Sequence, residues 1–149
     1  MKGLTLAADS AKKLIWIVAL IYISASSTES QRRQLHYEPE GVTLTGRVVT
    51  RTFYGPPNYG ENPKTDSKES QYILLLDSPI DVIATGNDPI DQTERRITRL
   101  TLVVFDFKKN PVEPLIGKRV RVEGTLFHAH TGHHHTKVLI IVSSIKRPR

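Results

Sequence analysis

An all-β fold is predicted from three observations. Runs of β-branched and apolar residues recur along the chain, and each is bounded by Gly, Pro, Asn or Asp. Within most runs apolar and polar residues alternate, which is typical of strands that bury one face. The runs give five strands, with one short helical turn between the third and the fourth. This is the element order of the OB-fold, a small, partly open barrel. A different small β-barrel or a sandwich is the alternative, because element order does not fix strand pairing.

The first predicted strand covers residues 42–53. Its inward series is Val42, Leu44, Gly46 and Val48. A glycine in this series allows the bend or bulge that a strand needs to curl around a small barrel.

The second predicted strand, residues 72–76, is strongly apolar and ends at Asp77-Ser78-Pro79, and residues 80–84 extend the sheet briefly. Residues 97–107 form the third strand. Residues 110–116 contain two prolines and allow at most one helical turn.

The fourth and fifth predicted strands form a hairpin. Val120, Val122 and Leu126 alternate along the fourth strand, and residues 138–142 are the more buried fifth strand. Five of the six histidines fall between the two strands, from position 128 to position 135. We therefore expect the main cluster of functional side chains of the chain at the tip of this hairpin.

A transition-metal site is one interpretation of this tip. If Thr131 and Gly132 alone form the turn, four imidazoles share one face, because side chains alternate along a strand. Opposed Cβ atoms are roughly 4.5–5.5 Å apart, close enough for histidines to share one zinc or copper ion. The predicted metal ligands are His128, His130, His133 and His135.

Two other registers stay open, because Thr131 is a poor match for a positive φ. A three-residue loop of residues 130–132 opposes Ala129 with His133 and breaks the quartet. A four-residue loop that ends at Gly132 pairs His128 with His133. The histidines could also be structural, satisfied by carbonyls and water at the rim of the core.

A Pro- and Tyr-rich loop follows the first strand at residues 54–60. In OB-folds the loop between strands 1 and 2 and the loop between strands 4 and 5 border the ligand cleft. Here these are the 54–60 loop and the histidine hairpin, so we expect both to border one cleft. The predicted ligand-binding residues are Tyr54, Asn58, Tyr59 and His134.

The sequence of the amino terminus predicts that the protein is exported. Lys12 and Lys13 precede the apolar residues 14–23, and small residues follow at 24–27, as in a secretory signal peptide. Residues 1–27 are thus a predicted signal peptide, or an uncleaved anchor. We expect a secreted or periplasmic protein without stable membrane insertion after cleavage; the alternative is a protein anchored in the inner membrane.

The remaining chain divides into a predicted disordered leader, residues 28–36, and one β domain, residues 37–146. After Ser27 the chain keeps 18 Lys and Arg against 14 Asp and Glu, a net charge of +4. This mild excess lies mainly at the chain ends and is weak support for a polyanion partner. The chain has no cysteine, so disulfides and thiolate ligands are excluded.

Several segments resemble a known family. Tyr37-Glu38-Pro39, the 54–59 segment Tyr-Gly-Pro-Pro-Asn-Tyr, residues 117–126 and the 131–136 segment Thr-Gly-His-His-His-Thr are similar to those of domain of unknown function 4431. The resemblance covers roughly residues 37–145 and implies a bacterial, exported β domain. It implies no activity, catalytic residue or ligand.

Three functional classes follow from this sequence. The first is an exported binding module for a transition metal, zinc or copper, or for a small ligand. The second is an OB-type module for a protein or an extended polymer, such as nucleic acid or a cell-envelope glycan, with Tyr54, Tyr59 and Phe127 as stacking surfaces. A zinc hydrolase ranks third, because the chain lacks a His-Glu-x-x-His element and Glu123 is expected on the face opposite His128.

Overall fold

The computed structural model describes residues 32–86 and 88–148. These residues form one six-stranded sheet and one 3-10 turn. The strands are β1 (Arg33–His36), β2 (Gly41–Tyr54), β3 (Lys68–Ile83), β4 (Glu94–Val103), β5 (Arg119–His128) and β6 (Val138–Lys146), and the turn is η1 (Glu113–Leu115). The predicted signal peptide, residues 1–27, lies outside the described residues. Within residues 32–86 and 88–148, no helix has the length and apolarity to cross a membrane.

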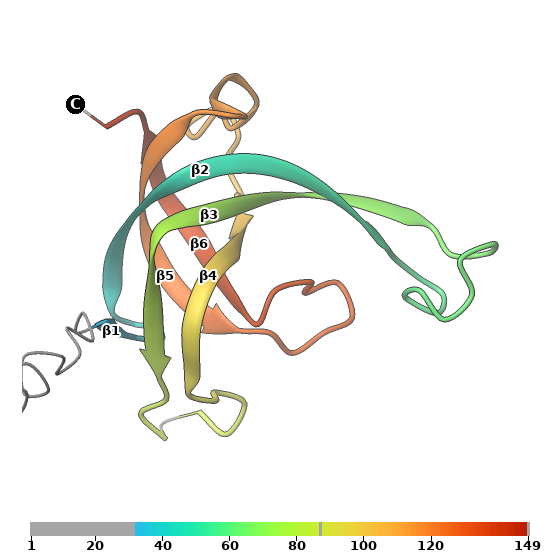
Figure 1. Cartoon of the computed structure of the whole chain (residues 1–149), viewed down its shortest axis with the longest axis horizontal. Helices are drawn as coiled ribbons and strands as arrows, with labels where there is room; N and C mark the ends of the chain where they lie inside the picture. The colour runs from blue at the N-terminus through green and yellow to red at the C-terminus, as the bar shows by residue number, and fades with distance from the viewer. Residues whose placement is uncertain (1–31, 87, 149) are drawn as a thin grey trace, which may run out of the picture. The chain divides into compact units, whose positions relative to one another are not determined.

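The strand pairs of this sheet follow one another in a closed ring (Figure 1). β2 pairs antiparallel with β3 and with β5, β3 pairs with β4, and β5 pairs with β6. The parallel pair of β4 and β6 completes the ring. The prediction of an all-β fold with one short helical turn between the third and fourth predicted strands is confirmed, because η1 connects β4 to β5.

The sixth strand, β1, occupies residues that the sequence assigned to the leader. It runs parallel to β3, with Leu35 opposite Val82. Leu35 and Tyr37 are 5% and 3% exposed, so this segment contributes to the core. A four-residue strand with one buried apolar side chain is too short to show an alternating pattern, which is why its sequence carries no strand signal.

Strand β3 is much longer than the predicted 72–76 strand. It continues through the Asp-Ser-Pro segment, where its register with β4 shifts between Leu75 and Ile80. Pro79, which has no N–H to donate, lies within this shift. The strand as a whole is sharply bent (Figure 1). At its other end, residues 68–72 of β3 pair with residues 50–54 of β2 as a two-stranded arm that carries residues 55–67 at its end (Figure 1).

The core lies inside the ring and contains the predicted inward series of the first and fourth strands. Val48, Val120, Val122 and Leu126 are fully buried. Gly46 sits where β2 changes partner, paired with both Leu76 and Val120, and a Cβ there would collide with the carbonyl oxygen of Leu75. Only glycine allows the strands to approach so closely at this crossing.

Candidate ligand-binding cleft

The connection between β5 and β6, residues 129–137, is named the histidine loop here. The last strand pair before it is His128 with Val138, followed by a hydrogen bond from Ala129 N to Lys137 O of 2.9 Å. None of the three short registers predicted from the sequence occurs. Gly132 is not among the described glycines with positive φ, so the left-handed residue of a tight turn or a bulge is missing.

The histidine loop is long because it is bound to the outer face of the sheet. Thr136 is 7% exposed, and its Oγ1 accepts a hydrogen bond from Thr101 N of β4 at 3.0 Å and donates to Val138 O at 2.8 Å. Gln71 of β3 donates from Nε2 to His133 O at 2.6 Å. These contacts hold the loop across β3 and β4, so a compact hairpin turn does not form.

Two imidazoles of the loop meet one carboxylate of β3. His133 Nδ1 lies 2.6 Å from Glu69 Oε1, and His135 Nε2 lies 3.2 Å from Glu69 Oε2. Partial burial would raise the pKa of Glu69, but the hydrogen bonds from His135 and His133, together with their charge, lower it. Glu69 is therefore ionised at neutral pH and accepts from both rings.

His133 also contacts the loop at the end of the arm. This loop, residues 55–67, is named the tyrosine loop here. Tyr59 Oη lies 3.2 Å from His133 Nε2, and the two rings meet edge to face at 5.4 Å. A Cβ at Gly132 would lie 2.8 Å from Cζ of Tyr59. Because His133 donates from Nδ1 to Glu69, its Nε2 in the neutral ring accepts from the Tyr59 hydroxyl.

The tyrosine loop is shaped by one buried carboxylate. Asp66 accepts hydrogen bonds from the backbone N–H groups of Asn58, Gly60 and Asn62 at 2.9, 2.8 and 3.2 Å, and from Asn58 Nδ2 at 3.1 Å. Burial would raise the pKa of Asp66, but these hydrogen bonds lower it. The side chain of Asn58 is thus occupied within its own loop.

Tyr54, the remaining predicted ligand-binding residue of this region, stands at the end of β2. Its ring carries Lys68 Nζ at 3.0 Å from the centroid, a cation–π contact. No contact in the described part of the chain joins Tyr54 to a histidine.

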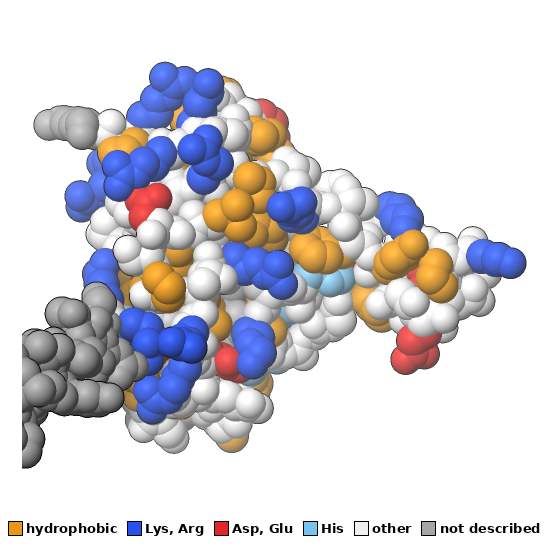
Figure 2. Space-filling view, in the orientation of Figure 1, with side chains coloured by type: hydrophobic (Ala, Val, Ile, Leu, Met, Phe, Trp, Pro, Cys, Tyr) orange, Lys and Arg blue, Asp and Glu red, His pale blue; other side chains and the backbone are white. Residues whose placement is uncertain are grey.

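A small cavity lies where the histidine loop covers the outer face of the sheet. Phe53 of β2 stacks on His135 with ring centroids 4.3 Å apart and an angle of 8°. The cavity has a volume of about 100 Å³ and is lined by Arg51, Phe53, Ile73, Leu75, Arg99 and Thr136. Figure 2 shows hydrophobic side chains flanked by Lys and Arg over the middle of the molecule, with a histidine beside them. The histidine loop and three strands therefore border this cavity, and the tyrosine loop reaches the histidine loop through the contact of Tyr59 with His133.

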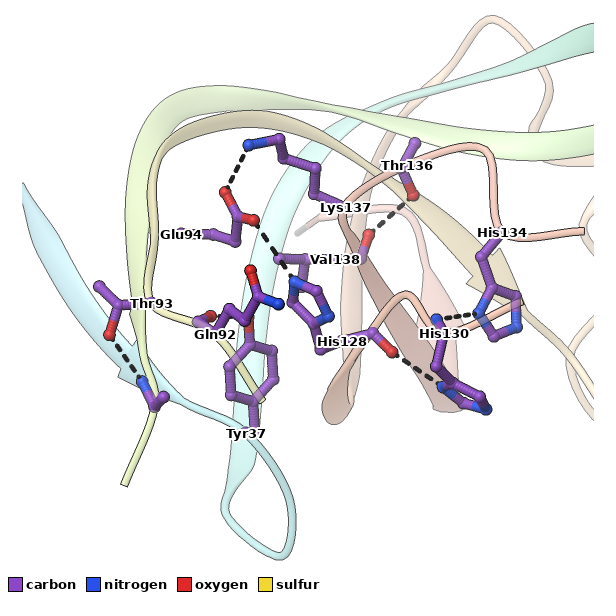
Figure 3. A network of polar contacts seen from close by, with 11 residues as sticks. Tyr37, Gln92, Thr93, Glu94, His128, His130, His134, Thr136, Lys137 and Val138 are labelled. Atoms are coloured by element: carbon purple, nitrogen blue, oxygen red, sulfur yellow. Dashed lines mark hydrogen bonds and ion pairs between the residues drawn. The ribbon is translucent and has the colours of Figure 1, made fainter. Parts of the chain in front are cut away.

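His128 stands apart from this cleft, at the start of the loop (Figure 3). Its Nε2 lies 3.4 Å from Glu94 Oε1, and Lys137 Nζ lies 2.9 Å from Glu94 Oε2. Burial would raise the pKa of Glu94, but the hydrogen bonds from Lys137 and His128 lower it. Tyr37 packs edge to face on His128 at 6.0 Å, and its own pKa is raised by burial and by Glu94.

His130 and His134 contact each other within the loop. His130 N donates to His134 Nδ1 at 3.1 Å, and His130 Nδ1 donates to His128 O at 3.1 Å (Figure 3). Burial, together with the charges of neighbouring histidines, lowers the pKa of His134. An acceptor Nδ1 and a lowered pKa both indicate a neutral His134 ring that packs against Phe127 at 5.4 Å.

The expected face of four imidazoles does not form. His128 is bound by Glu94, His130 by a carbonyl, and His133 and His135 by Glu69. Among the residues that the structure describes, no group of three or more His, Asp and Glu side chains is placed to hold a metal ion. The cause is the wide loop, in which the histidines bond to different carboxylates and do not converge on one point.

The comparisons with known proteins agree with the family resemblance in this region. Residues 106–146 match the model of the family described as domain of unknown function DUF4431. The match confirms the resemblance over η1, β5, the histidine loop and β6. No curated protein and no solved structure matches the chain.

The DUF4431 match contains all five clustered histidines but lacks the side chains from preceding segments that contact His128, His133 and His135. Tyr59, Glu69 and Glu94 lie outside residues 106–146. The site is therefore assembled between the matched segment and the preceding part of the chain.

Sequence reasoning missed the residues of β2, β3 and β4 that complete the cleft. The outer face of β3 carries every second residue: Glu69, Gln71, Ile73 and Leu75. Leu74, between two of them, lies on the opposite face, because side chains alternate along a strand. This alternation is visible in the sequence. The predicted strand began at residue 72, however, so Glu69 was assigned to a loop.

Proposed function

We propose that this protein is a binding module that holds a ligand in the cleft between the tyrosine loop and the histidine loop. One observation carries the proposal. Tyr59 and His133 lie 74 positions apart in the sequence, yet Tyr59 Oη and His133 Nε2 are 3.2 Å apart, and the loop that carries His133 also lines a cavity through Thr136. Ligand sites are commonly concave, apolar surfaces with a few placed polar groups, and OB-folds use these two loops.

The side chains of the cleft favour binding over catalysis. In Ser, Thr and Cys hydrolases the nucleophile is a hydroxyl or thiol bonded to a base. Within residues 32–86 and 88–148, neither His133 nor His135 has a Ser, Thr or Cys side chain as hydrogen-bond partner; their partners are Glu69 and Tyr59. Glu69 accepts hydrogen bonds from two imidazoles that lower its pKa, which makes it a weaker general base.

A transition-metal site is less well supported than a cleft for an organic ligand. Zinc and copper require several donor atoms that converge on one point. Here the predicted ligands His128 and His133 are bound by different carboxylates, Glu94 and Glu69. A metal titration therefore belongs in the test as a separate arm.

The proposed location, outside the cytoplasm, rests on the sequence pattern of residues 1–27. Its measurement is the N-terminal mass of the protein recovered from a bacterial periplasmic fraction. A mature chain that begins near Thr28 supports export. An intact chain in the membrane fraction indicates an anchor, and an intact chain in the cytoplasm contradicts export.

The binding proposal is tested by thermal unfolding of the full chain with a defined set of probes. These are zinc, copper, a neutral oligosaccharide, an oligogalacturonate and a single-stranded oligonucleotide. Ligands that bind only the folded state raise Tm, and a concentration of 100 times Kd stabilises by about 2.7 kcal/mol. We expect an organic probe to raise Tm, and the shift to be lost in the Tyr59→Ala and His133→Ala/His135→Ala variants.

The matched control is His36→Ala, which removes the sixth histidine, on β1, outside the cleft. It should keep the ligand-induced shift. Equal shifts in the cleft variants and in the wild type would place the ligand elsewhere and contradict the proposal. A shift with zinc or copper alone, lost in the double histidine variant, would instead establish the metal function.

A further inference from the structure

Two arginines of the cleft lack a side-chain partner among the described residues. Arg51 of β2 and Arg99 of β4 line the same cavity, and both side chains are exposed. Within the part of the chain that the structure describes, neither guanidinium makes a hydrogen bond or an ion pair. Two unneutralised cations therefore face one space of about 100 Å³.

Several other arginines on this sheet are paired. Arg119 Nη2 lies 2.8 Å from Asp77 Oδ2, Arg95 Nη1 lies 3.4 Å from Asp81 Oδ2, and Arg47 donates to Gly117 O at 2.6 Å. Arg51 and Arg99 differ from these because the side chains around them are apolar or already bonded. The guanidinium of Arg96, on the same strand as Arg99, also has no such partner among the described residues, but Arg96 does not line the cavity.

The apolar residues that line the cavity strengthen the attraction between its arginines and a negative charge. Ile73 is 1% exposed, and Leu75 and Phe53 are partly buried beside it. Apolar walls lower the local dielectric constant, so attraction between opposite charges exceeds its value in water. Guanidinium groups also match the two oxygens of a carboxylate or a phosphate with paired N–H donors.

The carboxylate nearest to Phe53 on the neighbouring strand does not oppose such a ligand. Glu69 stands directly opposite Phe53 in the β2–β3 pair. Its two oxygens are bonded by His133 and His135, at 2.6 and 3.2 Å. Hydrogen-bond donors on both oxygens reduce its repulsion of an incoming anion.

We infer that the cleft takes an oxyanion group, a phosphate or a carboxylate, between Arg51 and Arg99. The inference rests on the proposed function and names its ligand class. A cavity of about 100 Å³ admits the charged group alone. The rest of the molecule then lies on the open face next to Phe53 and the histidine loop, so the ligand is a longer molecule that carries the oxyanion.

The test is calorimetric titration of the full chain at low salt with two anionic probes and one neutral probe. The anionic probes are a single-stranded oligonucleotide, which carries phosphates, and an oligogalacturonate, which carries carboxylates; the neutral probe is maltohexaose. The variants are Arg51→Gln and Arg99→Gln. The matched control is Arg96→Gln, an exposed arginine of the same strand as Arg99 that does not line the cavity.

We expect at least one anionic probe to bind, and each cavity variant to weaken its Kd roughly tenfold or more, as for a lost hydrogen bond between charged groups. Arg96→Gln should leave Kd within twofold. Raising the salt concentration should weaken binding to the wild type, a measurement that needs no variant. Binding of the oligonucleotide alone assigns a phosphate, and binding of the oligogalacturonate alone assigns a carboxylate.

Two results would overturn the inference. The first is binding of an anionic probe with equal Kd in the wild type and both cavity variants. The second is absence of anionic binding at millimolar concentration. If maltohexaose then binds, and the His133→Ala/His135→Ala variant abolishes this binding, the proposed binding function stands and only the ligand class is rejected. If no probe and no metal binds, both proposals fail.

Discussion

The two ends of the histidine loop use the same pair of residue types for different purposes. At the base, Glu94 and His128 are 12% and 11% exposed, and Lys137 completes the ion pair. At the tip, Glu69 is 22% exposed while His133 is 55% exposed. The base joins β4 to β5, two strands of one sheet, whereas the tip joins the sheet to a separate loop.

This difference assigns the base to the fold and the tip to the ligand site. Breaking a buried pair leaves a charge without solvent, which is costly. An exposed pair is worth little and is easily exchanged for water or for a ligand. We therefore expect substitutions at the base to change stability, and substitutions at the tip to change loop motion and binding.

The largest expected loss of stability comes from Thr136→Val at the base. Valine keeps the shape but leaves the buried N–H of Thr101 without its acceptor. An unsatisfied buried donor costs about 1–3 kcal/mol of the free energy of unfolding. Urea denaturation measures this loss. Thr131→Val, at an exposed position of the tip, should change stability by about 0.5 kcal/mol or less; equal losses in both variants would remove the distinction between base and tip.

The second expected loss comes from Glu94→Gln. It removes charge-assisted bonds to His128 and Lys137, which are worth about 1–2 kcal/mol together. Because the folded pKa of Glu94 is lowered, its contribution is present above the unfolded pKa of about 4.3 and is lost as pH falls through the folded value. The difference between variant and wild type in urea denaturation should shrink below that pH. A constant difference down to pH 2 would contradict this origin.

A smaller effect is expected from His134, whose folded pKa is lowered by burial and by neighbouring histidines. Its contribution to stability is present above the unfolded pKa of about 6.5 and is lost as pH falls through the folded value. His134→Asn keeps an acceptor for His130 N and does not titrate. The stability of this variant should fall less than that of the wild type between pH 7 and pH 5. His36→Asn is the control, and the same flattening in both variants would exclude a role of His134.

The smallest effect on global stability is expected from Glu69→Gln at the tip. Its effect should be local, because both histidines that it holds belong to one loop. Hydrogen exchange of loop peptides, measured by mass spectrometry, should become faster for residues 129–137 while the core strands stay protected. Unchanged exchange of this loop would show that Thr136 and Gln71 alone hold it.

Much of the fold was predictable from local patterns. The alternation of Val120, Val122 and Leu126 identified β5 and its buried face, and the prolines of residues 110–116 limited that segment to one turn. The pairing of the tyrosine loop with the histidine loop followed from the element order. In contrast, β1 and the first residues of β3 were missed, because short or polar strands carry little hydrophobic periodicity.

The sequence by itself determined which residues carry the chemistry and on which connection they lie: five histidines between two strands, opposite a loop rich in Tyr and Pro. Only the tertiary structure decided which partner each imidazole takes. A turn type is a local property, but Thr101 and Thr136 are 35 positions apart, and Glu69 and His133 are 64 positions apart. Those distant contacts stabilise a nine-residue loop over the sheet, and they outweigh the short hairpin that the residues between His128 and Val138 suggest on their own.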